Sequence, residues 1–320
     1  MFRSILIYLS HAAWARKIVT RWKFAWRTAS RFVAGEKLDD AIRVVKALNA
    51  KGINATLDHL GEHTTSAEKA RQATEDILAM FEAIQESGVR SNVSIKLTQI
   101  GLAVDEQICE ENLMRIMQKS KEYNSFLRID IEEAAVVDKT LALFNKARQT
   151  CGCENVGQAI QAYLYRSKDD IEVLMKEQAR IRLCKGAYKE SEEVAYPHKA
   201  DVDANFDRLT KLLVDGSIAA GMPALSEDGR VPPIPAIASH DEKRISFAKQ
   251  YAAENKLAKN AIEFQMLNGI RRDLQEQLAA EGYPVRVYVP YGTEWYPYFV
   301  RRLAERPANV WFFVSNFFRK

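Results

Sequence analysis

The sequence lacks the residues from which several classes of protein are built. Its 320 residues include only four cysteines and five histidines. Four thiols in a chain of this size do not form a disulfide framework, which predicts reduced cysteines of the kind found in the cytosol. No histidines follow H-x-H or H-E-x-x-H spacing, and Cys151-Gly152-Cys153 has no partner at ligand spacing. A metal centre is therefore not expected.

Long apolar runs are also absent. None reaches the ~18 residues that a membrane span requires. The short apolar stretch near the start is interrupted by Tyr8, Ser10 and His11 and followed at once by Arg16 and Lys17, so a cleaved signal peptide is not expected. With 47% hydrophobic and 28% charged residues, the composition is that of a globular protein with a substantial core.

Charge is distributed unevenly. Residues 1–37 carry eight basic residues against the single acid Glu36, a net charge of +7, which leaves −3 for the rest of a chain whose total is +4. On a helical wheel the apolar residues of this segment share one face; they are Trp14, Ile18, Trp22, Ala25, Trp26, Ala29 and Val33. Such a helix suits an anionic lipid surface. Packing on its own barrel, packing on a partner subunit, or service as a transit peptide are the alternatives. Nucleic-acid binding is disfavoured because the charge beyond residue 37 is negative.

Beyond the basic segment, short β-rich runs alternate with longer helical periods. The eight strand cores are 54–57, 93–97, 127–131, 157–161, 181–184, 235–238, 262–265 and 285–289. Eight such units predict an α/β fold, a (β/α)8 TIM-like barrel with an N-terminal helical extension. A doubly wound fold is the alternative, but no Gly-x-Gly-x-x-Gly follows the first strand.

The predicted organisation has three parts. Residues 1–37 form the basic amphipathic extension, residues 38–310 the barrel that binds cofactor and substrate, and residues 311–320 a C-terminal tail. Within the barrel, residues 38–50 are expected to form an extra helix that closes the bottom, and residues 221–235 a long loop.

Polar residues gather where the predicted strands end, which is where barrel enzymes place their catalytic groups. Lys96 faces opposite to Ile95 and Leu97 in its strand. If those two pack outward, its amine enters the barrel mouth and needs a carboxylate, for which Asp130 and Glu62 are the candidates. The competing interpretation is an internal ion pair with a purely structural role.

Two further segments predict ligand contacts. Arg182 and Lys185 run into Gly186-Ala187-Tyr188, where a glycine allows close approach of the backbone, as in a site for a planar or phosphorylated cofactor. Near the C-terminus, the adjacent guanidiniums of Arg301 and Arg302 begin a helix just beyond a strand, which predicts a site for a small carboxylate. A solvated helix face is the alternative there.

These motifs, in order and each at a strand end, resemble those of flavin-dependent proline dehydrogenases in their monofunctional bacterial form. The resemblance covers about residues 35–310 and rests on five segments: Leu57–Glu62, Ser94–Gln99, Arg182–Tyr188, Glu263–Leu267 and Tyr288–Glu305. It implies oxidation of L-proline to 1-pyrroline-5-carboxylate, with FAD as cofactor and a membrane quinone as electron acceptor.

The same resemblance implies roles for individual residues. Catalysis falls to Lys96, Asp130 and Arg182. Substrate contacts fall to Lys96, Tyr288, Tyr298, Arg301, Arg302, Leu267, Glu62 and Glu305. FAD contacts fall to Gln161, Arg182, Lys185, Gly186, Ala187, Lys199, Ser239 and His240. The proton acceptor is not identified, and taken alone His240 is better explained as a structural histidine.

Two other functions stay open at this point. An interior Lys96 or Lys185 also suits a Schiff-base aldolase or lyase. A non-catalytic membrane-interaction module would use the basic N-terminal helix. The expected location is the cytoplasm, with peripheral contact at the inner face of the cell membrane, and self-association is left open.

Overall fold

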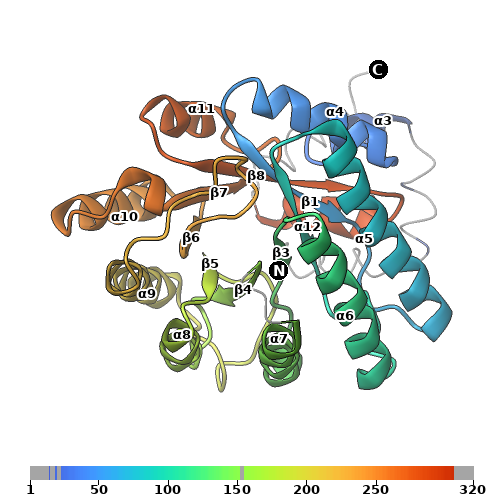
Figure 1. Cartoon of the computed structure of the whole chain (residues 1–320), viewed down its shortest axis with the longest axis horizontal. Coiled ribbons are helices and arrows are strands. Elements are labelled where there is room, and N and C mark those ends of the chain that lie inside the picture. Colours follow the sequence, from blue (N-terminus) through green and yellow to red (C-terminus); the bar gives the residue numbers. More distant parts are fainter. Residues whose placement is uncertain (1–13, 15–18, 20–22, 152–154, 306–320) are drawn as a thin grey trace.

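The computed structural model describes residues 14, 19, 23–151 and 155–305. Eight parallel strands close into a barrel in sequence order, and each strand pairs with its neighbours, β1 with β8 included. The strands are β1 (Asn54–His59), β2 (Ser91–Ile95), β3 (Leu127–Ile129), β4 (Val156–Gln161), β5 (Arg180–Cys184), β6 (Pro235–Ala238), β7 (Glu263–Leu267) and β8 (Val285–Tyr291). The predicted barrel is confirmed, and the closed sheet excludes the doubly wound alternative (Figure 1).

Two strands end earlier than predicted. β2 ends at Ile95 and β3 at Ile129, so Lys96 and Asp130 lie one residue beyond the regular strands. The carboxyl ends of parallel strands meet at one rim of the barrel, and both side chains therefore sit in the first turn of a βα loop.

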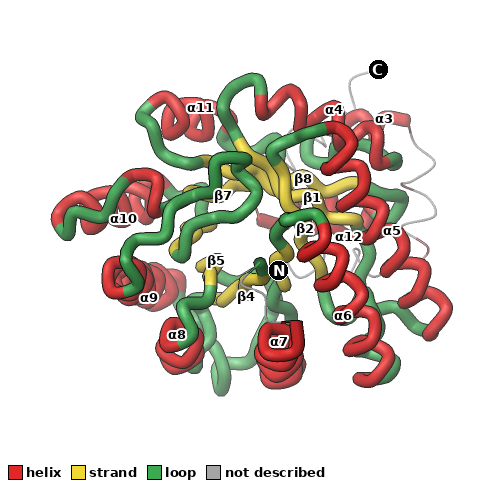
Figure 2. The backbone as a smooth tube through the Cα atoms, viewed as in Figure 1, coloured by secondary structure: helices red, strands yellow, loops and turns green. Residues whose placement is uncertain are grey.

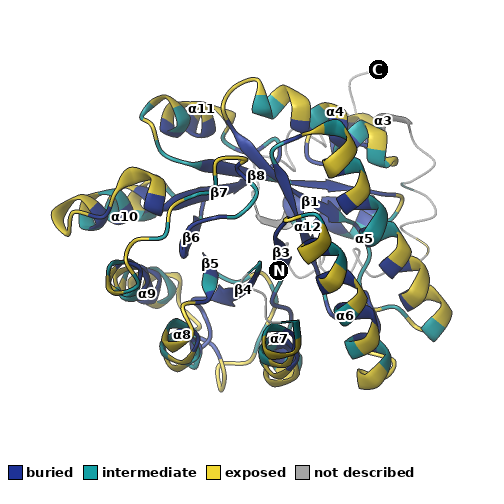
Figure 3. Cartoon of the chain, viewed as in Figure 1, coloured by how far each residue is buried: buried dark blue, intermediate teal, exposed yellow. Residues whose placement is uncertain are grey.

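A ring of helices covers the outside of the sheet (Figure 2). It comprises α5 (Ala67–Ser87), α6 (Glu106–Glu122), α7 (Val137–Cys151), α8 (Ser167–Lys176), α9 (Lys199–Ala219), α10 (Glu242–Glu254) and α11 (Arg272–Ala280), with the short turns η1 (Ala134–Val136) and η2 (Lys259–Ala261). Side-chain caps set two of the starts: Ser66 accepts from the Lys69 amide and Asp105 from the Ile108 amide. The strands and the inner helix faces are buried, whereas the outer faces are exposed (Figure 3).

The helix α4 (Leu38–Asn49) does not close the bottom of the barrel, as the sequence had predicted. It packs on the outside of β1 and β8, in the ring between α11 and α5 (Figure 1). Its apolar stripe of Ala41, Ile42 and Val45 is buried in the main core. The position is free because the helix that follows β8 lies elsewhere.

That helix, α12 (Trp295–Glu305), packs against α3 (Lys23–Ala29) in a second apolar cluster. Ala25, Ala29 and Val33 of the basic segment are fully buried there. The rings of Trp26 and Trp295 meet edge to face, 5.3 Å between centroids.

Backbone hydrogen bonds fasten the segment after α3 to the loops at the mouth of the barrel. The Ala34 amide donates to Pro290 O at 2.9 Å, and the Gly292 amide donates to Gly35 O at 3.0 Å. Of the three alternatives for the basic segment, the described part follows packing on its own barrel. Ile18 and Trp22 of the predicted apolar face lie outside the described residues. Within the described chain, no helix combines the length and apolar character of a membrane span.

Candidate active site

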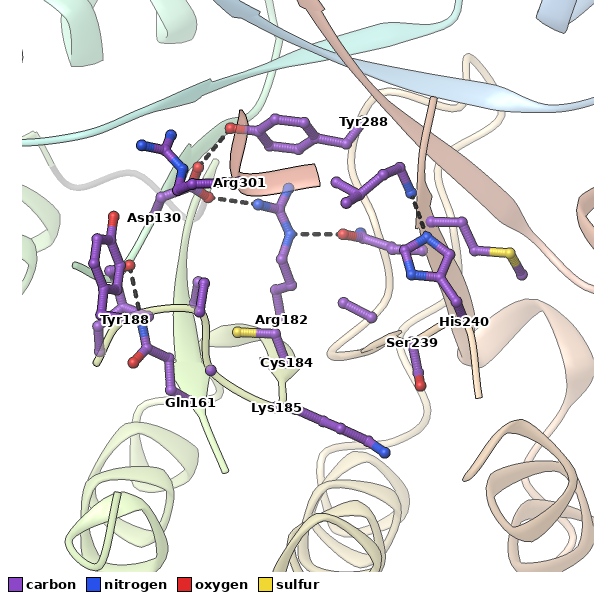
Figure 4. A pocket seen from close by; sticks show the side chains of 18 of the residues that line it. Asp130, Gln161, Arg182, Cys184, Lys185, Tyr188, Ser239, His240, Tyr288 and Arg301 are labelled. Atoms are coloured by element: carbon purple, nitrogen blue, oxygen red, sulfur yellow. Dashed lines mark hydrogen bonds and ion pairs between the residues drawn. The ribbon is translucent and has the colours of Figure 1, made fainter. Parts of the chain in front are cut away.

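A cavity of about 640 Å³ opens at the carboxyl ends of the strands, beneath α12. Every predicted site residue except Glu305 lines it: Glu62, Lys96, Asp130, Gln161, Arg182, Lys185, Gly186, Ala187, Lys199, Ser239, His240, Leu267, Tyr288, Tyr298, Arg301 and Arg302. The side chain of Glu305 lies outside the description that the structure gives. Residues from the ends of all eight strands and from α12 therefore line one space, and Figure 4 shows ten of them labelled.

Asp130 is held by donors from three sides. Arg182 Nη1 donates to Oδ1 at 2.5 Å, Ser94 Oγ donates to the same oxygen at 2.8 Å, and Tyr288 Oη donates to Oδ2 at 2.7 Å (Figure 4). Burial alone would raise the pKa of this carboxyl, but Arg182, Lys96 and the hydroxyl donors outweigh it and lower the pKa below its usual value. Asp130 is a permanent anion that fixes the orientation of its donors.

Lys96 enters the cavity as predicted, with its amine among three acceptors. Nζ lies 3.4 Å from Asp58 Oδ1, 3.5 Å from Asp130 Oδ2 and 3.3 Å from Tyr288 Oη. Asp130 was a predicted partner, but the second partner is Asp58 and not Glu62. Burial would lower the pKa of Lys96, yet these neighbours hold it well above its ordinary value. The amine is a stable cation.

Asp58 was given no role in the predicted site. It is only 1% exposed and lines the same cavity. Burial raises the pKa of its carboxyl to about 6, with Asp130 and Glu62 adding to the effect and Lys96 and Tyr288 opposing it. Its position at the end of β1 was a usable signal, because polar residues at strand ends face the mouth.

Glu62 lines the same cavity and is paired with Arg301. Arg301 Nη2 donates to Oε1 at 2.7 Å and Nη1 to Oε2 at 3.0 Å, so the guanidinium holds the carboxylate through two parallel bonds. In this geometry both amino groups of the Arg301 guanidinium are engaged by the Glu62 carboxylate. Arg302 is 8% exposed and lies over the ring of Tyr298, 5.0 Å from its centroid.

The other end of the cavity is formed by β4, β5 and β6. Gln161 Nε2 donates to Ile131 O at 3.1 Å, while its Oε1 is buried without a hydrogen-bond partner. Lys185 Nζ lies between Asp203, at 2.5 Å, and Asp241, at 2.8 Å. Lys199 also pairs with Asp203.

Gly186 has φ +123°, and a Cβ there would meet the ring of Tyr163 at 2.4 Å. The sequence had explained this glycine by the approach of a ligand. The structure adds a steric reason, because the ring of Tyr163, in the loop after β4, occupies the space that a side chain would need.

His240 has a structural bond as well as a place in the cavity. The Leu267 amide donates to its Nε2 at 2.9 Å, so this ring nitrogen carries no proton in that arrangement (Figure 4). Ser239 Oγ accepts from the Asp241 amide at 3.1 Å. His240 thus ties the loop before α10 to the end of β7, whereas Ser239 stabilises that loop itself.

Among the described residues, one group has side chains close enough together to bind a metal ion. His63, Glu132 and Glu133 each offer a ligand atom, and these atoms lie within 4.8 Å of one another. However, both oxygens of Glu132 accept hydrogen bonds from Thr98, and His63 Nε2 lies 3.3 Å from Glu133 Oε1. These contacts explain the three residues without a metal, because they hold the loop that carries Glu62 and His63.

The fold and the site together define a (β/α)8 barrel with a cavity at the carboxyl ends of its strands, where barrel enzymes place their active sites. A sequence model for proline dehydrogenase matches residues 41–314. The chain belongs to the proline dehydrogenase family and is an oxidoreductase of that family.

Individual relatives agree over nearly the whole chain. Proline dehydrogenase 1 of Bacillus subtilis is 40% identical over 324 residues, covering all of both chains. Proline dehydrogenase of Deinococcus radiodurans is 44% identical over 294 residues, which are 91% of this chain and 90% of the relative. The crystal structure of proline utilization A from Bdellovibrio bacteriovorus, inactivated by N-propargylglycine, matches with a TM-score of 0.79 and 25% identity over 88% of this chain and 33% of that larger chain.

Proposed function

We propose that this enzyme oxidises L-proline to 1-pyrroline-5-carboxylate with FAD as cofactor and passes the electrons to a membrane quinone. The observation that carries the proposal is the presence, in one cavity, of a guanidinium on α12 that holds a carboxylate and of a Lys96–Asp130–Tyr288 cluster. The fork of Arg301 suits the carboxylate of an amino acid, and the Lys96 cluster suits its ring.

The residues present fit a flavin. The cavity has the size of a cofactor site, and the buried, unpartnered Gln161 Oε1 is an acceptor available to a ligand N–H. Arg182, Gly186, Ala187 and Gln161 would hold the ring system. Ser239, His240, Lys185 and Lys199 would hold the ribityl and diphosphate groups.

When bound, FAD would supply the acceptor for the hydride of the substrate carbon. Arg182 is suited to that chemistry because its guanidinium, fixed by Asp130 and by Gln265 Oε1 at 2.6 Å, places permanent positive charge at the centre of the cavity. Such a cation stabilises electron density that arrives on a neighbouring group.

For the substrate, Arg301 and Arg302 would bind the carboxylate, while Tyr288, Tyr298 and Leu267 form the wall around the ring. Glu62 holds Arg301 until a substrate carboxylate competes for it, so the ion pair would open and close as a gate. We assign the same neutralising role to Glu305.

The Schiff-base alternative fits the geometry poorly. An amine that attacks a carbonyl must lose its proton, and Schiff-base lysines usually have a lowered pKa. Lys96 instead has its pKa held well above the ordinary value by three anionic or polar neighbours. Lys185 is paired with two carboxylates.

The test uses purified protein and light absorption. We expect FAD to be released on denaturation and proline to bleach the flavin spectrum under anaerobic conditions. Release of FMN alone, a colourless protein that takes up no FAD, or no bleaching by millimolar proline would refute the proposal. Trapping of a carbonyl substrate by borohydride would support an aldolase instead.

The quinone step motivates a peripheral membrane contact through the basic N-terminal segment on the cytoplasmic face. Because residues 25–33 pack beneath α12, the truncation that tests this contact should remove residues 1–22 only. We expect salt-sensitive loss of flotation with anionic liposomes, at ~1 kcal/mol for each basic residue near the surface, and unchanged reduction of a soluble dye. Unaltered flotation would remove the membrane role.

A further inference from the structure

The two aspartates that share Lys96 differ in how well they are satisfied. Asp130 accepts hydrogen bonds from Arg182, Ser94 and Tyr288 in addition to its contact with Lys96. Asp58 is more deeply buried, with 1% of its side chain exposed against 12% for Asp130, and its charged form is favoured by Lys96, at 3.4 Å, and by the Tyr288 hydroxyl. Two carboxyl groups in one site with different environments are how proteins separate a permanent anion from a group that exchanges a proton.

The proposed reaction needs such a group. Free proline carries its ring nitrogen as an ammonium ion, and only the neutral amine has the lone pair that becomes the second C=N bond when hydride leaves the adjacent carbon. One proton must therefore leave the nitrogen before oxidation. Lys96, a stable cation in the same cavity, would disfavour a second cation beside it and so promote this loss.

We propose that Asp58 is the group that accepts the proton of the substrate ammonium. The N–H bond breaks, its electron pair stays on nitrogen, and the Asp58 carboxylate becomes a neutral carboxylic acid. Charge is conserved, since an ammonium and a carboxylate become an amine and an acid. The inference rests on the proposed function and adds the proton acceptor to it.

The charged and polar groups around Asp58 support this assignment, and they come from four parts of the barrel mouth. Lys96 follows β2, Asp130 follows β3, Tyr288 lies on β8, and Glu62 lies in the loop after β1. Burial among these groups raises the pKa of Asp58 to about 6, close to the range where a general base works best at neutral pH. Asp130, with its lowered pKa, is too weak a base for the same task.

The experiment compares pH profiles of kcat/KM for proline in the FAD-loaded enzyme with a soluble dye. For the wild type we expect a plateau at neutral pH and a fall below pH about 6, where Asp58 becomes protonated. In Asp58→Asn the plateau should disappear. The value should instead rise about tenfold per pH unit, because the variant depends on the neutral proline already present in solution.

Asp130→Asn is the matched control, since it removes a carboxylate from the same lysine. It should lower kcat/KM but retain the plateau at neutral pH, with the acid limb moved to lower pH because Asp130 no longer raises the pKa of Asp58. Asp58→Glu keeps a proton acceptor and should restore the plateau. FAD content and the melting temperature of each variant show whether the fold is intact.

A second measurement needs no turnover. With carboxyl-labelled aspartate, the carbon resonance lost in Asp58→Asn should titrate near pH 6 in the wild type. If Asp58→Asn lowers kcat/KM equally at all pH values, Asp58 is only a structural partner of Lys96 and the inference fails. If the wild type neither binds FAD nor bleaches with proline, the proposed function fails instead, so the two failures are distinct.

Discussion

The two ends of the barrel interior both contain buried charges, but they treat them differently. At the bottom, Arg286 is 1% exposed and Glu263 0% exposed, and they form a bidentate pair at 2.9 and 3.0 Å. Arg286 also donates to Ala55 O and Gly229 O, each at 2.7 Å. At the mouth, Lys96 has three contacts, all between 3.3 and 3.5 Å.

The difference separates charges that maintain the structure from charges available for chemistry. The bottom pair has its hydrogen-bonding groups occupied, so no ligand can bind there without breaking it. The long contacts of Lys96 and the sparse contacts of Asp58 leave these groups able to reorient toward a substrate. Gln265 connects the ends, because it accepts from Arg182 and donates to Glu263 at 2.6 Å.

The largest effect is expected from breaking the bottom pair. Glu263→Gln leaves the Arg286 guanidinium buried without its counter-charge, which should lower the free energy of unfolding by about 3–5 kcal/mol. Denaturant unfolding followed by circular dichroism measures this. The double variant Glu263→Leu with Arg286→Met should recover much of the loss. A loss below about 1 kcal/mol in the single variant would mean that the two ends do not differ as described.

The next largest effect concerns the open end. Arg301→Lys and Arg302→Lys each keep the charge but lose the planar fork. A charge-assisted hydrogen bond contributes ~1.5–3 kcal/mol, so KM for proline should rise roughly ten- to a hundredfold while FAD content stays normal. Steady-state kinetics with a soluble dye measure the change.

Pyrrolidine, which lacks the carboxylate, is the control substrate. Its slow turnover should barely respond to either substitution. If both variants keep the proline KM within about twofold of the wild type, less than half a kcal/mol, the carboxylate assignment is wrong.

The smallest effect has the opposite sign to the first. The pKa of Asp58 is raised from 3.8 to about 6 on folding, so the folded state favours the protonated carboxyl. The associated stability is present at low pH and is lost as the pH rises through about 6. Asp58→Asn should therefore stabilise the protein at pH 7.5 by about 1–3 kcal/mol and have little effect near pH 4.

Denaturant unfolding at both pH values checks this prediction. Destabilisation at pH 7.5 comparable to that of Glu263→Gln would place Asp58 with the structural charges at the bottom. A gain in stability would mark it as a residue retained for function at a cost to the fold.

Much of the barrel was predictable from local pattern. Short apolar runs between helical periods identify buried parallel strands, and all eight were confirmed. The signal is clear because a strand of a parallel sheet is buried on both of its faces and is therefore apolar along its length. Because strand ends meet at one rim, the sequence also indicated which polar residues would gather there. The position of α4 was wrong, since nothing local shows that α12 leaves a gap in the outer ring and lies over the mouth instead.

The partners of the site residues were harder to predict than the residues themselves. Lys96 was correctly aimed inward, yet Glu62 was a poor choice of partner because Arg301, more than two hundred positions away, holds it. Pairing depends on loop paths across the mouth, which residue spacing does not record. The raised pKa of Asp58 was unpredictable for the same reason, because it depends on which groups surround the carboxyl in the folded chain.

The sequence by itself determined the barrel, the family and the kinds of side chain at the mouth, because these follow from periodicity, strand-end position and specific motifs. Tertiary structure decided which carboxylate stays charged and which can take a proton. That choice depends on burial and on the donors Ser94 of β2 and Arg182 of β5, which bind Asp130, whereas Asp58 is stabilised as an anion by Lys96 and Tyr288. Long-range packing sets those distances, and electrostatic energy in a dehydrated cavity depends steeply on them.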